Sequence, residues 1–372
     1  MGLSSRVKLV SAFGLVLTVV ASLTFFGASR GISHASGTFQ QSFIQAESNV
    51  TTTTSSCESW QPVPVQYPPM YSGNYGFDGV AAIAPNNVWA VGDFTEHWDG
   101  TRWSKVAGGG LNGIAALSAN NIWAVGGVAN VDGASWGKAL IKHWNGTRWG
   151  IVPGANLGSI ASQLNAVAAI STNNIWAVGG DSNGTLIEHW NGSIWSIVTN
   201  PTMNLPNNEL TSISALSAND IWTVGGTVWF PAGIQHQIIE HWNGKVWSII
   251  PSPNPSVYTN PTGVTAISAN NVWAVGDGGI EHWNGKEWSI VPNPAGGTLE
   301  AVTAISANNI WAVGTLAEHW NGSSWSIANT GISGSEWDPV WAVAKVPHTN
   351  TLWAVGTYWM GDYSNPLTEF YC

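Results

Sequence analysis

One short pattern recurs seven times along this chain of 372 residues: an apolar run that begins at a tryptophan and closes on a glycine. The copies are Trp89 to Gly92, Trp123 to Gly126, Trp176 to Gly179, Trp222 to Gly225, Trp273 to Gly276, Trp311 to Gly314 and Trp353 to Gly356. Strand-like sequence that repeats every roughly 35 to 50 residues is typical of blades arranged around an axis. The sequence therefore predicts an all-β fold, a seven-bladed β-propeller of four-stranded antiparallel blades.

Two turns recur at fixed spacing inside the repeats. An Asn-Asn or Asn-Asp pair precedes each of the first six tryptophans, as Asn173-Asn174 does before Trp176. Asparagine tolerates left-handed backbone angles, so we expect a tight hairpin there. A second turn, Asn-Gly or Asp99-Gly100, follows each Glu-His-Trp or Lys142-His-Trp run, and Asn-Gly is a strong hairpin signal. Each blade is thus expected to hold four strands joined by short turns and longer loops.

The last repeat stops before its fourth strand. It ends at Glu369-Phe370-Tyr371-Cys372, whereas Cys57-Glu58-Ser59-Trp60 near the other end carries a fourth-strand tryptophan in the register of the repeat. We therefore expect the ring to close by pairing its two ends within one blade. Cys57 and Cys372, the two cysteines of the chain, fall beside each other in this alignment, where a disulfide can form. Two buried thiols are the alternative.

The N-terminal segment has the features of an export signal. Arg6 and Lys8 precede an apolar stretch from Leu9 to Ala28, and small residues follow up to Ala35. We expect residues 1–35 to be a signal peptide, with an uncleaved membrane anchor as the alternative. Residues 36–56, rich in serine and threonine, are expected to be a flexible tether, and residues 57–372 the propeller. Such a protein would be secreted or extracytoplasmic, with the cell surface as one location, and disulfides form in these compartments.

The amino-acid composition restricts the classes of partner that the chain can bind. Past the leader, eight basic residues stand against all 21 acidic ones, a formal net charge of −13. Such a chain disfavours nucleic acid and anionic lipid, so a membrane partner is expected only if the N-terminal segment stays uncleaved. We expect a monomer, no cofactor and no metal. The ring also contains only Arg102 and Arg148 as arginines, which disfavours a carboxylate-clamping arginine cluster.

The residues repeated in every blade are expected to be architectural. Six histidines lie one per blade near the outer hairpin, which would leave them too far apart to share an ion. The repeated Glu-His pairs are expected to hold the outer strands by hydrogen bonds, and the repeated tryptophans to pack between blades. A carbohydrate platform is the functional alternative for the tryptophans.

The variable segments predict where a ligand binds. In a propeller the connections between strands two and three, and between strand four and the next strand one, emerge on one rim. The longest two-to-three loops are expected at Gly127–Ala139, Gly226–Gln237 and Thr357–Leu367. Aromatic residues on such loops need local packing or a ligand. The candidate ligand-binding residues are Trp136, Trp229, Phe230, Tyr358, Trp359, Asp362 and Tyr363.

Blades that combine a double glycine at the end of strand two, as in Ile122-Trp123-Ala124-Val125-Gly126-Gly127, with an aromatic in strand three and a tryptophan in strand four resemble kelch repeats. The resemblance spans Trp60 to Cys372. The Asn-Gly-x-x-Trp hairpin is also similar to the Asp-box and tectonin-type turns of bacterial propellers. These resemblances imply a propeller that binds proteins or glycans and imply no particular reaction.

We therefore expect an exported binding propeller, not an enzyme, that presents its long-loop rim to a glycan or protein. The alternative is a propeller enzyme acting on extracellular polysaccharide, a paired-carboxylate hydrolase or lyase. Its discriminating feature would be two convergent carboxylates from the set Asp93, Asp132, Asp181, Asp277, Glu300, Asp338 and Asp362.

Overall fold

The structure is a computed structural model of the whole chain. It describes residues 59–65, 75–128, 137–158, 160–227, 237–253, 260–294, 297–328, 339–360 and 363–372. Residues 57–372 form one unit. The predicted signal peptide and tether, residues 1–35 and 36–56, lie outside the described residues, and so does Cys57. Among the described residues, no helix has the length and apolarity needed to cross a membrane.

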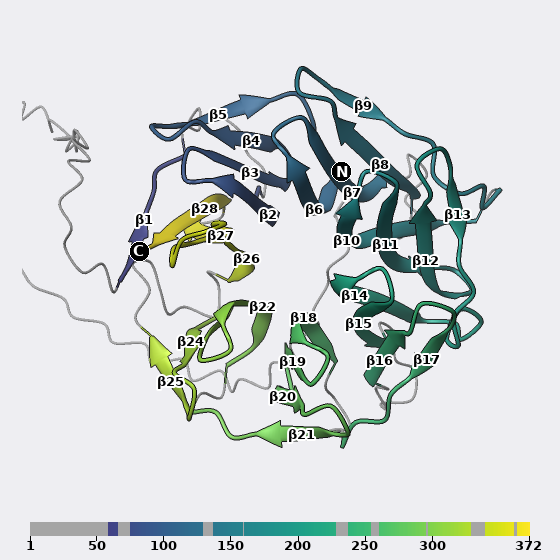
Figure 1. Cartoon of the computed structure of the whole chain (residues 1–372). Coiled ribbons are helices and arrows are strands. Elements are labelled where there is room, and N and C mark those ends of the chain that lie inside the picture. Colours follow the sequence, from purple (N-terminus) through teal and green to yellow (C-terminus); the bar gives the residue numbers. More distant parts are fainter. Residues whose placement is uncertain are drawn as a thin grey trace, which may run out of the picture. The chain divides into compact units, whose positions relative to one another are not determined.

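Seven four-stranded antiparallel sheets follow one another along the chain, as the repeat predicts, and we number them as blades 1 to 7. Blades 1 to 4 contain β2(Phe77–Ala84), β3(Asn87–Gly92), β4(Thr95–Trp98), β5(Trp103–Val106); β6(Leu111–Ser118), β7(Asn121–Val128), β8(Lys138–Trp144), β9(Trp149–Ile151); β10(Ser162–Ser171), β11(Asn174–Asp181), β12(Gly184–Trp190), β13(Trp195–Ile197); and β14(Asn208–Ser217), β15(Asp220–Thr227), β16(Gln237–Trp242), β17(Trp247–Ile249). Blades 5 to 7 contain β18(Pro261–Ser268), β19(Asn271–Gly276), β20(Gly279–Trp283), β21(Trp288–Val291); β22(Leu299–Ser306), β23(Asn309–Gly314), β24(Ala317–Trp320), β25(Trp325–Ala328); and β26(Val340–Lys345), β27(Leu352–Met360), β28(Tyr363–Tyr371), β1(Trp60–Pro62). The first strand of each blade lies innermost and the fourth forms the outer edge (Figure 1).

The ring closes as the sequence predicts. Strand β1 pairs antiparallel with β28, so that Trp60 faces Tyr371 and Pro62 faces Glu369. In blade 3 the equivalent pair is Trp190 and Trp195, which one short turn connects. The fourth strand of blade 7 therefore comes from the N-terminal side of the ring and its other three strands from the C-terminal end.

The repeated closing glycine is explained by the close approach of strand one to strand two. A Cβ built on Gly179 would lie 2.1 Å from the carbonyl oxygen of Gln163, which is far inside contact distance. The same clash, at 2.1 or 2.2 Å from a backbone oxygen, arises at each of the other six positions, Gly92, Gly126, Gly225, Gly276, Gly314 and Gly356. Every blade therefore needs a residue without a side chain where strand two meets the start of strand one.

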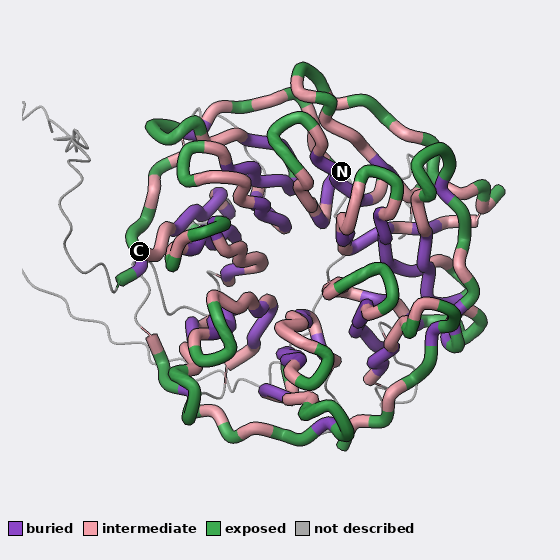
Figure 2. Tube along the Cα trace, in the orientation of Figure 1, coloured by how far each residue is buried: buried purple, intermediate pink, exposed green. Residues whose placement is uncertain are grey.

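Tryptophans connect neighbouring blades. In blade 4, Trp222 contacts Trp283 and Trp288 of blade 5, with ring centroids 5.3 and 5.6 Å apart and the second pair edge-on at 80°. The same arrangement recurs at every junction. At the junction of blades 6 and 7, Tyr371 and Trp60 from the two ends of the ring take these places against Trp311. The buried residues of the ring follow these junctions (Figure 2).

The asparagine before each of these tryptophans has a different role from the one predicted. Its Oδ1 accepts two hydrogen bonds in blade 1, where Trp89 Nε1 donates to Asn87 at 3.1 Å and His97 Nε2 lies 2.9 Å away. Because an amide oxygen only accepts, the proton of the histidine lies on Nε2. Blades 2 to 6 repeat this pairing, with Asp220 in place of asparagine in blade 4.

The expectation of left-handed asparagines in these turns is wrong. Among the described residues that are not glycine, only Asn207 and His348 have positive φ. The Asn-Gly turns, in contrast, place glycine at φ between +94° and +98° in five of the six hairpins and at +92° in the sixth, as their sequence predicts. The paired asparagines are thus explained by side-chain hydrogen bonds, and the Asn-Gly turns by backbone conformation.

The strand-three acids join neighbouring blades rather than outer strands within a blade. Glu188 Oε2 accepts from Ala155 N at 2.8 Å, and Ala155 belongs to the connection that leaves the preceding blade. Glu240 and Glu318 likewise accept from Thr202, at 2.6 Å, and from Asn293, at 2.9 Å. In blade 2 a lysine replaces the acid, and Lys142 Nζ donates to Gly109 O. Since the carboxylates are buried, each needs these donors from the neighbouring blade.

Replacing Gly179 with alanine tests the close-approach explanation. The new methyl group would collide with a backbone oxygen, so we expect Gly179→Ala to lower the free energy of unfolding by about 2–4 kcal/mol in urea titrations. Gly150→Ala is the matched control, because the nearest atom to a Cβ there is 4.0 Å away. Equal stability of both variants would contradict the explanation.

The pH dependence of stability tests the burial of Glu188. Burial raises the pKa of Glu188 to about 7, although the Ala155 hydrogen bond acts in the opposite direction. A carboxyl group whose pKa is higher in the folded chain stabilises the fold fully below its unfolded pKa, and that contribution is lost as the pH rises through about 7. Glu188→Gln removes this loss, so we expect its stability relative to the native chain to rise by about 1–3 kcal/mol between pH 5 and pH 8. Parallel stability curves would contradict this, and the exposed Glu287→Gln serves as the control.

Candidate functional site

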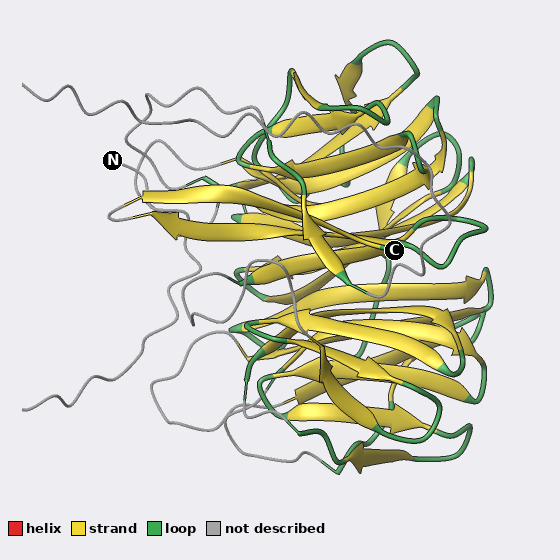
Figure 3. Cartoon of the chain, turned by 90° about the vertical axis from the view of Figure 1, so that its left-hand side faces the viewer, coloured by secondary structure: helices red, strands yellow, loops and turns green. Residues whose placement is uncertain are grey.

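Both variable connections emerge at one end of the blades, as predicted. Phe77, at the start of strand one in blade 1, pairs with Gly92 at the end of strand two. The connection into strand one and the connection out of strand two therefore lie together, and we call this end the long-loop rim (Figure 3). The Asn-Asn and Asn-Gly turns lie at the other end, which we call the short-turn rim.

Four of the predicted site residues, Trp136, Trp229, Phe230 and Asp362, lie outside the described residues. Tyr363 is the first residue of β28. Two lie on the long-loop rim with their side chains described. Tyr358 is half-buried, whereas the side chain of Trp359 is 39% exposed and belongs to the exposed large hydrophobic residues of the ring.

The prediction of a long loop at Thr357–Leu367 is wrong. Strand β27 continues to Met360 and β28 begins at Tyr363, so most of this segment is a β-hairpin. Its register pairs Tyr358 with Asn365 and Trp359 with Ser364. Strand two ends at its glycine in blades 1, 5 and 6, so the hairpin of blade 7 extends past the neighbouring strands at the long-loop rim (Figure 3).

The two aromatic residues of this hairpin point to opposite faces, because neighbouring residues of a strand alternate. Tyr358 packs against the cluster of Trp60, Trp311 and Val340 at the junction of blades 6 and 7. Trp359 lies on the other face, toward blade 1, which is also the face of Val355 in the junction with that blade. Tyr358 is therefore part of the core, whereas 39% of the Trp359 surface is exposed.

A second tryptophan lies on the same face, closer to the axis. Trp341, in the first strand of blade 7, is half-buried, and its Nε1 donates to Thr357 Oγ1 at 3.3 Å. Blade 1 adjoins this face through Gly76, whose Cβ would overlap the Thr357 methyl group. Gly76 N in turn donates to Asp93 Oδ2 at 3.0 Å. Trp341, Thr357 and Trp359 of blade 7 and Asp93 of blade 1 thus border one stretch of the long-loop rim, which we call the blade 7–1 site.

Polar residues encircle the axis near this rim. The residue at the bulge of strand one donates to a backbone oxygen of the next blade at four junctions: Asn112 to Leu164, Asn165 to Leu210, Thr211 to Pro261 and Thr262 to Leu299, at 2.8 to 3.0 Å. Asp78, Glu300 and Trp341 occupy the same position in blades 1, 6 and 7. The three residues that depart from the donor pattern therefore lie on consecutive blades, around the blade 7–1 site. An alignment of the repeats would have shown this departure.

The carboxylates required by the enzymatic alternative lie on separate blades where they are described. Asp93, Asp181, Asp277 and Glu300 belong to blades 1, 3, 5 and 6. Asp181 Oδ1 accepts from Asn183 N and Gly184 N of its own turn, at 2.6 and 3.1 Å. Asp132, Asp338 and Asp362 lie outside the described residues. Within the described part of the chain, no group of three His, Cys, Asp or Glu residues could hold a metal ion.

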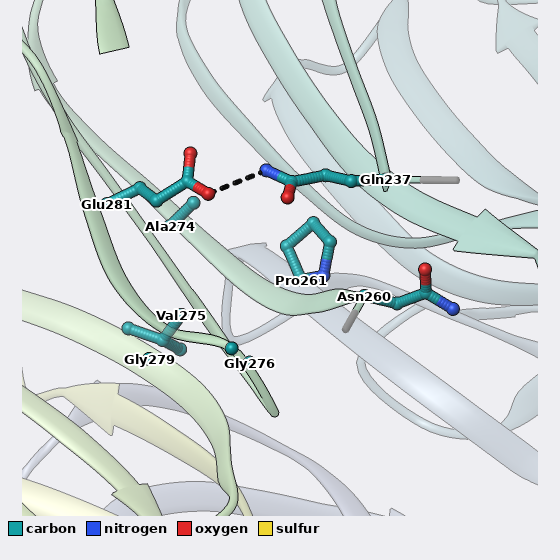
Figure 4. A pocket seen from close by; sticks show the side chains of 9 residues that line it. Gln237, Asn260, Pro261, Ala274, Val275, Gly276, Gly279 and Glu281 are labelled. Carbon is teal, nitrogen blue, oxygen red and sulfur yellow. Dashed lines mark hydrogen bonds between the residues drawn. The ribbon is translucent and has the colours of Figure 1, made fainter. Parts of the chain in front are cut away.

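A narrow hollow opens between blades 4 and 5. It has a volume of about 10 Å³ and is bordered by Gln237, Asn260, Pro261, Gly279 and Glu281, among others (Figure 4). Gln237 Nε2 donates to Glu281 Oε1 at 2.9 Å, and Ser252 Oγ hydrogen-bonds the other carboxylate oxygen. Because both oxygens of Glu281 are used inside the protein, the hollow belongs to the junction between blades.

Comparison with solved structures places the fold. The propeller is similar to "YCF48 bound to D1 peptide", with a TM-score of 0.59 and 13% identity over 85% of this chain and 99% of that one. For YCF48 from Cyanidioschyzon merolae the TM-score is 0.57 and the identity 12%, over 84% of this chain and 98% of that one. For the WD40 β-propeller domain of Doa1 the TM-score is 0.56 and the identity 12%, over 84% of this chain and 97% of that one. No family model matches the chain. No curated protein matches it either.

Proposed function

We propose that this protein is an exported binding propeller that recognises a protein segment at the blade 7–1 site of its long-loop rim. The observation that carries the proposal is Trp359, a 39% exposed tryptophan on a hairpin that extends past its neighbours. Exposing an indole costs hydration free energy, and aromatic residues are enriched where binding energy concentrates. One of the similar structures is described as bound to a peptide, which supports a protein ligand. A glycan is the other ligand class that the kelch-like and Asp-box-like repeats suggest.

Selection from a random peptide library tests this proposal. The full-length chain is used as bait, and the dissociation constants of the selected peptides are then measured with Trp359→Ala. Since truncating a central aromatic typically costs more than 1 kcal/mol, we expect binding at least about fivefold weaker.

Ile194→Ala is the matched control, because Ile194 is 61% exposed but lies on the short-turn rim. Unchanged affinity of Trp359→Ala, or an equal loss in the control, would contradict the proposed location. A library that yields no peptide, together with capture on a glycan array that Trp359→Ala abolishes, would replace the protein ligand by a glycan.

We also propose that export allows a disulfide between Cys57 and Cys372. Cys372 directly follows Tyr371, which pairs with Trp60. In blade 3 the turn from Asn191 to Ile194 fills the same interval, so the two cysteines would replace the turn by a covalent bridge. The N-terminal arginine, lysine and apolar stretch support export.

Alkylation of the native, unreduced protein tests the bridge. We expect neither cysteine to react, and we expect Cys372→Ser to lower the free energy of unfolding by about 2–5 kcal/mol. Two reactive thiols in protein recovered from outside the cytoplasm would contradict the bridge. A recovered N-terminus beyond Ala35 would support cleavage of the leader.

A further inference from the structure

The two rims of the ring carry opposite charge. Among the described residues, exposed or half-exposed acids gather where strand one begins or strand two ends, on the long-loop rim: Asp78, Asp93, Asp181, Glu209 and Asp277. Three cations reach this rim in the described part of the chain: Lys138, Lys105, whose Nζ lies 5.6 Å from the ring centroid of Phe94, and Lys142, whose Nζ donates to Gly109 O. The acids therefore outnumber the cations at the end of the ring that carries Trp359.

Cations gather on the short-turn rim instead. Four lie in the Asn-Gly hairpins and one at the end of the first strand of blade 7: Arg102, Arg148, Lys245, Lys286 and Lys345. Their acidic neighbours are fewer, namely Asp99, Asp220 and Glu287. Asp220 is paired with His241 at 2.9 Å, and Asp99 lies 3.9 Å from Arg102. The charges of the described residues are thus divided unevenly between the rims.

We infer that the long-loop rim takes an extended protein segment that carries lysine or arginine side chains. The inference rests on the proposed function and names the chemistry of the partner. Like charges around one rim add to a potential that attracts cations and speeds association, an effect that salt screens. An exposed indole also attracts ammonium and guanidinium groups through its π face. The blade 7–1 site offers both, because blade 7 carries Trp359 and Trp341 there, and Asp93 of blade 1 accepts from Gly76, which lies against Thr357.

Asp78 strengthens this assignment. It occupies the position at which Asn112 and Asn165 donate to the next blade, and a carboxylate cannot make that donation. Blade 1 thus carries a carboxylate where blades 2 and 3 carry an amide. Asn112 also shows that the fold accepts asparagine at this position. Asp78→Asn therefore removes the charge of the side chain and keeps its shape.

Binding of synthetic peptides tests the inference. Three peptides of twelve residues share their phenylalanines and glycines and differ only in carrying four lysines, four glutamines or four glutamates. Binding to the immobilised full-length chain is measured at low and at high sodium chloride concentration. We expect the lysine peptide to bind at least about tenfold more tightly than the glutamate peptide at low salt, with the difference shrinking as salt is added.

Three variants locate the effect. The double variant Asp78→Asn with Asp93→Asn should weaken binding of the lysine peptide at least about threefold, because each exposed charge pair contributes modestly. Trp359→Ala should weaken it further. Asp99→Asn with Glu287→Gln, on the short-turn rim, is the matched control and should change nothing, since asparagine already occupies the Asp99 position in the other hairpins.

Two outcomes would overturn the inference and leave the proposed function intact: library-selected peptides that lack lysine and arginine but still need Trp359, or equal binding of all three synthetic peptides. A lysine peptide that binds the acidic-rim variants as tightly as the native chain would overturn it as well. Sedimentation could instead detect rings that associate head to tail and that the lysine peptide does not separate. In that case the partner of the long-loop rim would be the short-turn rim of a second copy, and the inference would be overturned.

Discussion

The contact of one tryptophan with two aromatic residues of the next blade is the interaction on which the rest of the ring depends. Sheets that radiate from an axis diverge outward, so large side chains must fill the space between them. The indole of Trp222 does this at the junction of blades 4 and 5, and its position is fixed because its Nε1 donates to Asp220. The same side-chain oxygen receives His241, which lies against the indole with ring centroids 4.3 Å apart. One half-buried acceptor thus orients two rings.

Ring closure follows from the same contact. Trp60 and Tyr371 belong to opposite ends of the ring sequence, yet both contact Trp311 as a single hairpin would. Blade 7 differs from blades 1 to 6 in the partners of its strand-two tryptophan. Phe370 replaces the histidine against Trp353, and Trp353 Nε1 has no hydrogen-bond partner. Apolar packing therefore carries this junction without the shared acceptor found in blades 1 to 6.

The sequence predicts the repeated backbone features of the ring, and it misses the extended hairpin of blade 7 and the partners of the repeated polar side chains. Seven blades, the closure and the Asn-Gly turns follow from spacing, because each copy repeats the same physical requirement. The extended hairpin of blade 7 was missed because Thr357–Leu367 resembles a loop in composition, and only its pairing shows a strand. The second asparagine of each turn was misinterpreted, because its acceptor role depends on a histidine that is distant in sequence. The site could be assigned to a rim, but Asp93 of blade 1 comes close to the hairpin of Trp359 only through the closed ring.

The difference between repeated and single residues also separates structural residues from candidate binding residues. Histidines, strand-three acids and junction tryptophans recur and are used inside the protein, whereas the exposed indole of Trp359 occurs once. This distribution favours a ring that serves as a rigid support for one binding surface. Rigidity reduces the entropy lost when a partner docks, which suits recognition by few residues.

The central claim is that the aromatic junctions make the ring one cooperative unit, closed by its two ends. Hydrogen exchange of the Trp60→Ala variant, followed by mass spectrometry, tests it most directly. The account predicts that β22 to β25 of blade 6 and β26 to β28 of blade 7 lose protection together, and that the remaining blades become less protected by a similar free energy. Loss confined to β28, with every other strand as protected as in the native chain, would contradict it.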